Sequence, residues 1–372
     1  MFRFLFMIGL SACVITGCTD QRQIEKLGFT HSVGFDLIKG EGAEEERLQV
    51  TLVIPSMENQ VDKKKQILTT VSKSSKEARL KLSQQSDKQI VSGQVRNTLF
   101  GIALAREGLW KHIDTYVRDP AIGPNVKLTI VDGNAHELLS KDYPQHSLTG
   151  RYIDKLIEKE IQGQTVPEAT IYSWSRDYYD DGIDPVAPLI NSLRDHVRID
   201  GVALFNEDKY VGKIEPIHSV IFSFLRGDFR QGELYMELPD EKKKEKEIVL
   251  LSSIINKRNI DVERLAGPQK FRVTMRITIK GSVLEYLGER KLSNDAQKKE
   301  LEHAIEKYIR QTSEKLIAHM QKLKADGMGI GKAVRNHVSY EEWDKMNWDE
   351  VFSKLKVEFQ VKVKIRDNGK FK

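Results

Sequence analysis

The chain has 372 residues, of which 40% are hydrophobic and 30% are charged, a balance typical of a folded protein rather than a disordered one. Its 59 basic and 54 acidic side chains leave a net charge of only +5, and no basic stripe is interleaved with aromatic residues, which argues against nucleic-acid binding. At about 150 residues per domain, this length predicts two or three domains.

The N-terminus has the layout of an export signal. Arg3 precedes an apolar stretch over residues 4–15, which is shorter than the ~20 apolar residues needed to cross a membrane. Small residues at positions 16 and 17 stand directly before Cys18, as a lipoprotein signal peptidase requires. We predict cleavage before Cys18 and attachment of diacylglycerol to its thiol. An uncleaved helix or an ordinary signal peptide is the alternative.

Cys18 would be the only cysteine of the mature chain, because Cys13 leaves with the signal. The mature chain would then contain no disulfide, and its stability would come from packing. Burial of acyl chains contributes about 0.8 kcal/mol per methylene, so two chains on Cys18 suffice for a lasting anchor. Further acylation of its amino group depends on the host and stays open.

Strands and helices alternate over the first half of the mature chain, which favours an α/β or α+β domain. Apolar residues in alternation or in short runs predict strands at 29–37, 48–54, 90–91 and 126–131. Helical spacing predicts one helix carrying Val71, Ala78 and Leu82, one within 97–117, and a short one that ends near Leu139.

The middle of the chain is rich in turn residues. Residues 174–188 collect Asp, Gly and Pro and predict a long loop, and a domain boundary is expected near 197. Residues 201–212 predict a β-hairpin with a polar turn, followed by a strand at 234–238. The charged run at 240–247 predicts a solvated loop or strand edge.

The C-terminal third has the clearest periodicity. Residues 271–279 and 357–365 alternate apolar and polar side chains, so each predicts a strand with one buried face. Between them a long helix is predicted, capped by Ser293 and closed by Gly327. One long helix packed across a sheet is therefore expected.

Two motifs suggest a ligand but are incomplete. Residues 326–332 resemble a phosphate-binding loop, but Asp326 stands where a glycine is needed and a long helix precedes it, so we predict a helix end and turn. Asp177, Asp180 and Asp181 lack the alternate spacing of a calcium loop and predict a solvated turn.

No complete catalytic motif is present in the sequence. His136 and Glu137 lack the second histidine of a zinc-binding helix, and no G-x-S-x-G elbow occurs. We therefore expect no enzyme activity, no catalytic residue, no cofactor and no metal site.

Taken together, the ordered segments of the mature chain resemble the C-subunit family of spore germination receptors, often written Ger(x)C. The similarity is carried by Cys18 close to the first strand, Gly34-Phe35-Asp36, residues 96–100 and 104–109, Arg118-Asp119-Pro120, Pro124-Asn125-Val126, residues 201–205 and 208–212, Gly327-x-Gly329-x-Gly331, Trp343, Trp348 and the last alternating strand.

This resemblance implies an elongated, three-domain lipoprotein of the α+β (mixed α/β) class, with mixed sheets packed by helices. The expected division is a signal peptide at 1–17, an N-terminal domain at 18–197, a middle domain at 198–262 and a C-terminal domain at 263–372. The expected partners are membrane lipid, through Cys18, and two integral membrane subunits, A and B. The implied location is the outer face of the inner spore membrane.

The implied function is a non-enzymatic role in nutrient-triggered germination. The alternatives are a lipid-anchored small-molecule binding protein and a surface hydrolase whose residues are distant in sequence. Arg118-Asp119-Pro120 and the helix face with Arg106 and Glu107 are candidate contact surfaces, although turn formation and salt bridging also explain these residues.

Overall fold

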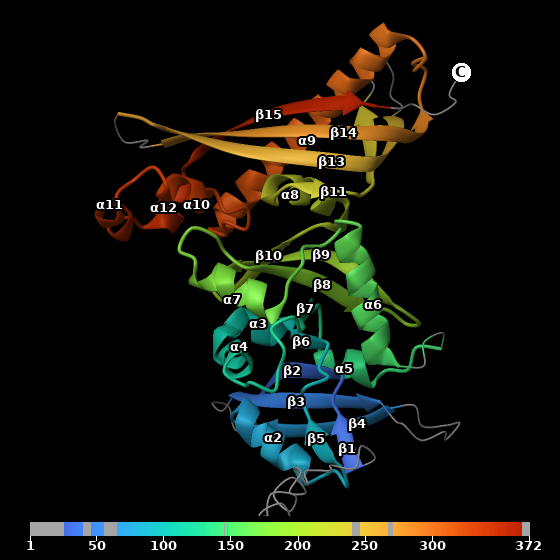
Figure 1. Cartoon of the computed structure of the whole chain (residues 1–372), viewed down its shortest axis with the longest axis vertical. Coiled ribbons are helices and arrows are strands. Elements are labelled where there is room, and N and C mark those ends of the chain that lie inside the picture. The colour runs from blue at the N-terminus through green and yellow to red at the C-terminus, as the bar shows by residue number, and fades with distance from the viewer. Residues whose placement is uncertain are drawn as a thin grey trace, which may run out of the picture.

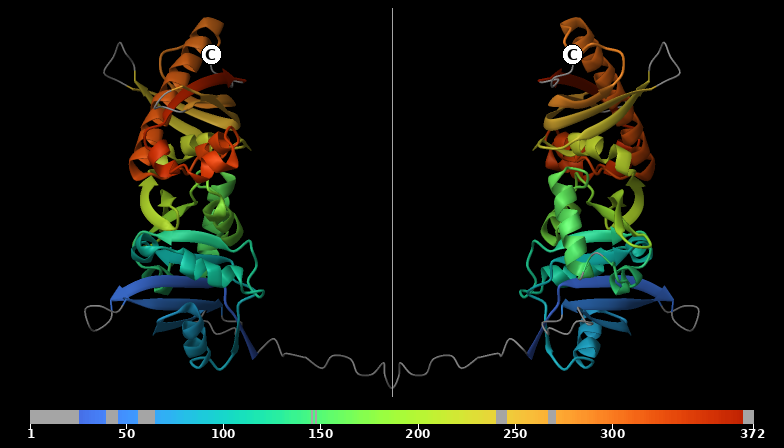
Figure 2. Two further views of the ribbon diagram at one scale, coloured as in Figure 1. Left: turned by 90° about the vertical axis from the view of Figure 1, so that its left-hand side faces the viewer. Right: turned by 90° about the vertical axis from the view of Figure 1, so that its right-hand side faces the viewer.

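The computed structural model describes residues 26–39, 46–55, 65–144, 146, 148–239, 246–266 and 271–366. The predicted signal peptide at 1–17, Cys18 and most of the charged run at 240–247 lie outside the described residues. The described chain is elongated, and its elements follow one another along the long axis (Figure 1). Figure 2 shows that the molecule is narrower in the two side views.

An eight-stranded mixed sheet forms the N-terminal part of this stack. Its central strands, β2, β6, β7 and β8, pair in parallel, whereas the outer strands pair antiparallel. In spatial order the strands are β10 (Lys209–Ile214), β9 (Val197–Asn206), β8 (Val186–Ser192), β7 (Lys127–Val131), β6 (Asn97–Gly101), β2 (Ser32–Lys39), β3 (Glu46–Pro55) and β4 (Lys65–Ser72). The predicted strands at 48–54 and 126–131 and the hairpin at 201–212 are confirmed.

Helices cover both faces of this sheet, because the central strands bury side chains on both sides. Phe100 packs into one cluster with Leu104 and Trp174, whereas its neighbour Leu99 packs into another with Ile153. The first cluster is covered by α2 (Ser75–Ser83), α3 (Ile102–Glu107), α4 (Trp110–Val117) and α7 (Ile171–Tyr179), and the second by α5 (Ala135–Ser140) and α6 (Thr149–Gln162). A small parallel pair, β1 (Leu27–Phe29) and β5 (Gln89–Val91), adjoins β3.

The loop predicted at 174–188 is confirmed only over residues 180–185, because α7 occupies its first part and β8 its last. Thr170 and Ser173 form a capping box that starts α7, and Trp174, which is 1% exposed, anchors the helix on the sheet. Burial of this aromatic side chain outweighs the turn-forming composition of the segment that follows.

A five-stranded sheet forms the C-terminal part. Its strands are β11 (Phe229–Arg230), β12 (Leu234–Pro239), β13 (Lys246–Arg264), β14 (Phe271–Leu287) and β15 (Lys356–Ile365). Both predicted alternating strands are confirmed, and they pair in parallel as β14 and β15. Helix α9 (Asp295–Leu323) links them and packs against β15. The remaining helices are η2 (Pro216–His218), α8 (Ser219–Arg226), α10 (Ile330–Arg335), α11 (Tyr340–Asp344) and α12 (Trp348–Phe352).

The ends of α9 differ from those predicted. Asn294, rather than Ser293, caps the helix, because its side chain accepts from two backbone N–H groups in the first turn. The helix ends at Leu323, where Lys324 turns left-handed with φ 54°. Gly327 therefore does not close the helix, and the loop at 326–329 is free to pack elsewhere.

The two sheets share a hydrophobic cluster. Val186 and Leu204 of the eight-stranded sheet pack with Phe222 of α8 and with the core of the C-terminal sheet. The strands of the region 198–262 divide between the sheets, with β9 and β10 in one and β12 and β13 in the other. The division into three domains stays a prediction.

Candidate functional site

Cys18, the predicted lipid attachment site, lies outside the described residues and stays a prediction. Among the residues that the structure describes, no helix is long and apolar enough to span a membrane. Two other motifs of the sequence lie within the described residues. They are the turn at Asp119 and the loop that begins at Asp326.

Asp119 forms a bridge to α2. Its Oδ2 atom lies 3.3 Å from Lys76 Nζ and 3.1 Å from an Arg79 guanidinium nitrogen. Its Oδ1 atom accepts the N–H of Ala121, which fixes the turn after α4. Arg118 instead pairs with Asp114 on its own helix. The two charged residues of the predicted contact turn thus have different roles.

The pKa of Asp119 reflects competing effects. Burial alone would raise the pKa of its carboxyl, but the Ala121 amide and the Lys76 cation hold that pKa below its ordinary value. Asp119 is therefore ionised at neutral pH. It neutralises one of the two cations that α2 presents at this position.

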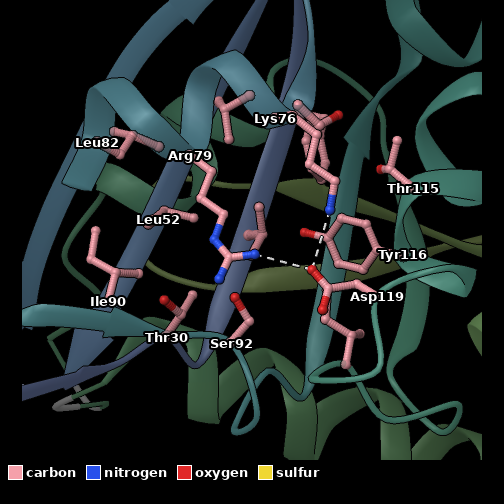
Figure 3. A pocket seen from close by; sticks show the side chains of 15 residues that line it. Thr30, Leu52, Lys76, Arg79, Leu82, Ile90, Ser92, Thr115, Tyr116 and Asp119 are labelled. Carbon is pink, nitrogen blue, oxygen red and sulfur yellow. Dashed lines mark hydrogen bonds and ion pairs between the residues drawn. The ribbon is translucent and has the colours of Figure 1, made fainter.

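A pocket opens beneath α2 at this bridge (Figure 3). Its cavity volume is about 60 Å³. In Figure 3 Lys76 and Arg79 reach from α2 toward Asp119, whereas Thr30 and Ser92 rise from the opposite wall toward Arg79. The apolar lining comes from the strands, α2 and the turn, and includes Val33, Phe35, Leu52, Leu82, Ile90 and Ile122.

The pocket contains hydroxyl groups without partners. Thr30 is 1% exposed, and its Oγ1 atom has no hydrogen-bond partner among the described residues. The same is true of the buried Oγ atom of Ser75. Burial also raises the pKa of Tyr116, so this phenol stays protonated. The pocket therefore has apolar walls, buried neutral hydroxyls and one excess positive charge at its mouth.

Sequence reasoning missed most of this pocket. Asp119 belongs to a sequence motif, whereas Thr30, Lys76 and Arg79 do not. The spacing of three positions between Lys76 and Arg79, which puts both on one helix face, was the available signal. Arg106 and Glu107, the other predicted contact residues, lie exposed at the end of α3 and do not line the pocket.

The loop at 326–332 lies against the eight-stranded sheet. Asp326 is 1% exposed, and its carboxylate accepts the N–H groups of Ile330, at 3.0 Å, and Gly331, at 2.7 Å. The indole N–H of Trp348 donates to the same carboxylate at 3.2 Å. These donors would bind an anion in a phosphate loop, but here the Asp326 side chain occupies that position. The predicted turn is confirmed in place of a phosphate loop.

Asp184 connects this loop to the N-terminal part. Its carboxylate accepts the backbone N–H of Asp326 at 2.6 Å and that of Glu207 at 2.9 Å. Burial raises the pKa of Asp184 to about 7 and that of Asp326 to about 6, against the lowering effect of these hydrogen bonds.

Two of the three aspartates considered as calcium ligands, Asp177 and Asp180, also pair across this contact. Asp177 binds the half-buried Arg226 of α8 at 2.6 Å. Asp180 pairs with Lys332 and Arg335 of α10. The described residues contain no cluster of potential metal ligands. The contact formed by residues 177–184 with α8 and residues 324–335 is called the junction below.

Both parts of the chain are similar to known protein families. Residues 20–192 match the family described as "Spore germination protein N-terminal domain", and residues 200–369 match "Spore germination B3/ GerAC like, C-terminal". The chain is 24% identical over 370 residues to "Spore germination protein GerQC" of Bacillus cereus, covering 99% of both chains. It also resembles the crystal structure of the GerBC protein, with a TM-score of 0.57 and 16% identity, covering 91% of this chain and 98% of that one, a likeness of fold alone.

Proposed function

The chain belongs to the Ger(x)C family of germinant receptor C subunits, and from this premise we propose that it serves nutrient-triggered spore germination as a lipid-anchored subunit. Lipid on Cys18 would hold it on the outer face of the inner spore membrane, beside the integral membrane subunits A and B. Its role there would be assembly or signalling rather than catalysis. The family match along nearly the whole chain is the observation that supports this proposal.

The junction supports a role in which the subunit acts as one body. Buried hydrogen bonds, ion pairs and a shared hydrophobic cluster join the two family-matched parts. A contact made by one part with a membrane subunit would therefore shift the other part with it. Such a body could pass on a mechanical or steric signal without a chemical step.

A lipid tether also explains how modest contacts suffice. Confinement beside membrane partners raises the effective concentration to the order of millimolar, so that weak surfaces bind. The described part of the chain begins at Lys26, only eight positions after Cys18, which keeps the body near the membrane in this proposal.

The test is nutrient-triggered loss of refractility in spores that carry Cys18→Ala, compared with wild type, a full deletion and Cys13→Ala. Cys13 is the matched control, because it would leave with the signal peptide. We expect the Cys18→Ala and deletion spores to lose the response to the same nutrient, while Cys13→Ala spores and a receptor-independent trigger behave normally.

The other outcomes separate the parts of the proposal. A normal response in Cys18→Ala spores would contradict the anchor. A normal response in deletion spores to every nutrient tested would contradict the germination role itself. Fractionation of the spore membranes reports the location of each variant independently of germination.

A second candidate function is small-molecule binding, and a pocket of about 420 Å³ beside the junction is the observation that favours it. In this function the subunit would bind a ligand without its membrane partners. Equilibrium binding to the purified chain separates the two functions, because assembly alone predicts no saturable ligand.

A further inference from the structure

We propose that a basic pocket beside the junction binds a small divalent oxyanion, of the phosphate or dicarboxylate type, with Arg258 as its main contact. This inference goes beyond the germination role and does not rest on it, because it assigns a ligand to the contact between the two family-matched parts of the chain. It is carried by the size of the pocket, by the sign of its charges and by the partners of Arg258.

The size and the walls of the pocket are the first observation. Its cavity volume is about 420 Å³, which lies within the range of about 300–1,000 Å³ that is typical of small-molecule sites. Arg176 and Ile183 line it from the N-terminal part, whereas Arg226, Arg258 and Lys332 line it from the C-terminal part. A ligand in this pocket would therefore contact both parts.

The sign of the charges is the second observation. Among the described residues, the charged side chains that line the pocket are all basic, and they are Arg176, Arg226, Arg258 and Lys332. Arg176 and Arg226 share the carboxylate of Asp177, each at 2.6 Å. Lys332 shares the carboxylate of Asp180 with Arg335. Two carboxylates thus pair with the four lining cations, and the excess of two positive charges suits a divalent anion.

The partners of Arg258 are the third observation. Its Nη1 atom donates to the carbonyl oxygens of Leu225, at 2.7 Å, and Met328, at 2.9 Å. Its Nε and Nη2 atoms donate to no described residue, and no described carboxylate forms an ion pair with this guanidinium. The carboxylate of Asp228 accepts the backbone N–H of Arg258 instead. One edge of the guanidinium is therefore left with two N–H donors, the fork that fits two oxygens of a carboxylate or phosphate.

The surroundings of Arg258 make an anion favourable there. The side chain is half-buried, and burial together with the neighbouring Arg226 cation lowers the pKa of Arg258. A cation withdrawn from water without a paired counter-ion costs free energy, and a bound anion would offset this cost. Since the same anion would contact residues of both parts, its binding would also stabilise the junction.

The test uses the full-length chain purified in detergent micelles, with empty micelles as the blank. Inorganic phosphate and succinate are titrated by calorimetry at slightly alkaline pH, where both carry two negative charges, and sodium chloride holds the ionic strength constant. Acetate, which carries one charge, is titrated beside them. We expect saturable binding of phosphate, succinate or both, and at least about tenfold weaker binding of acetate, as for the loss of one charged hydrogen bond. The tighter of the two divalent anions identifies the type of ligand.

Two variants locate the site. Arg258→Gln should weaken binding of the divalent anion at least about tenfold, because the free edge of the guanidinium is lost. Arg258 also binds two backbone carbonyls, so a second variant is made at Arg176, whose side chain is 52% exposed. Arg176→Gln leaves Asp177 paired with Arg226 and should weaken binding severalfold.

Arg79→Gln is the matched control. Arg79 also pairs with an aspartate and has a side chain that is 49% exposed, but it belongs to α2, at the end of the molecule far from the junction (Figure 1). The variant removes the same charge from the chain and should bind the divalent anion as wild type does. Thermal unfolding with and without the anion gives a second readout, because a ligand of the folded state raises the midpoint.

Three results would overturn the proposal. They are no saturable binding of either divalent anion at constant ionic strength, acetate binding as tight as theirs, and equal affinities of Arg176→Gln and Arg79→Gln. The first would mean that diffuse counter-ions alone balance these cations. None of them bears on the spore assay, so failure of this inference is distinguishable from failure of the germination role.

Discussion

The backbone N–H of Asp326 donates to the carboxylate of Asp184 at 2.6 Å, although the two residues lie 142 positions apart in the chain. The backbone N–H of Asp184 in turn donates to the carbonyl of Asp326 at 3.1 Å. This reciprocal pair joins the two family-matched parts at the buried Asp326 and the half-buried Asp184. The stability of the junction should therefore depend on these two aspartates and on the glycines beside them.

Replacement of Asp326 by Ala should strongly destabilise the protein. The change leaves the buried N–H groups of Ile330, Gly331 and Trp348 without their acceptor, at about 1–3 kcal/mol for each group that water does not reach. We expect a loss of roughly 3 kcal/mol or more in the free energy of unfolding, measured by urea denaturation with tryptophan fluorescence. Asp344→Ala, at the end of α11, is the control. A loss below about 1 kcal/mol would show that the carboxylate does not organise the loop.

The stability of the junction should depend on pH through Asp184. Its pKa is raised by burial from 3.8 to about 7, so the folded state holds the proton more tightly than the unfolded state does. This contribution is complete below the unfolded pKa and is lost as the pH rises through about 7. We expect the free energy of unfolding of wild type relative to Asp184→Asn to fall between pH 5 and pH 7, by up to about 1.4 kcal/mol per pH unit. Parallel curves for the two proteins would exclude this titration.

Gly182 should tolerate no side chain. A Cβ atom there would lie 2.4 Å from the backbone nitrogen of Lys332, so two backbone segments would have to separate. We expect Gly182→Ala to lower the free energy of unfolding by about 2–3 kcal/mol, as for other overpacked sites. Gly227→Ala is the control, because its Cβ would meet nothing within 4 Å. Equal denaturation midpoints for the two variants would contradict the close approach.

The bridge at Asp119 should contribute little to stability. Its partners, Lys76 and Arg79, have side chains that are 59% and 49% exposed, so water and salt screen the attraction. We expect Asp119→Asn to change the free energy of unfolding by less than about 1 kcal/mol. Thermal or urea unfolding at low and high salt measures the effect. A larger loss would mean that the bridge holds α2 in place.

Local patterns account well for the regular elements of the C-terminal part. Alternation over residues 271–279 and 357–365 identified β14 and β15, because one face of each strand packs on apolar neighbours. The long helix between them was also predicted, but its end was not. A left-handed Lys324 ends α9 earlier than the glycine that the pattern favoured.

Local sequence patterns could not predict the junction or the pocket beneath α2, because each is built by residues that are distant in sequence. Thr30, Arg79 and Asp119 come from a strand connection, a helix and a turn, and only the fold brings them together. Asp326 was noted because it interrupts a glycine motif, but its partner Asp184 lay in a segment taken for a loop. The capping box at Thr170 was the local signal that would have corrected that prediction.

The junction also affects when the two parts of the chain can finish folding during synthesis. A ribosome makes the chain from its N-terminus, so Asp184 emerges long before Asp326, its partner 142 positions later. Until the last strand and the loop arrive, Val186 and Leu204 lack the apolar neighbours that cover them in the finished protein. Contacts between such distant segments form slowly, and exposed apolar surface invites aggregation meanwhile. We therefore expect the N-terminal part to be most prone to aggregation while the rest of the chain is still being synthesised.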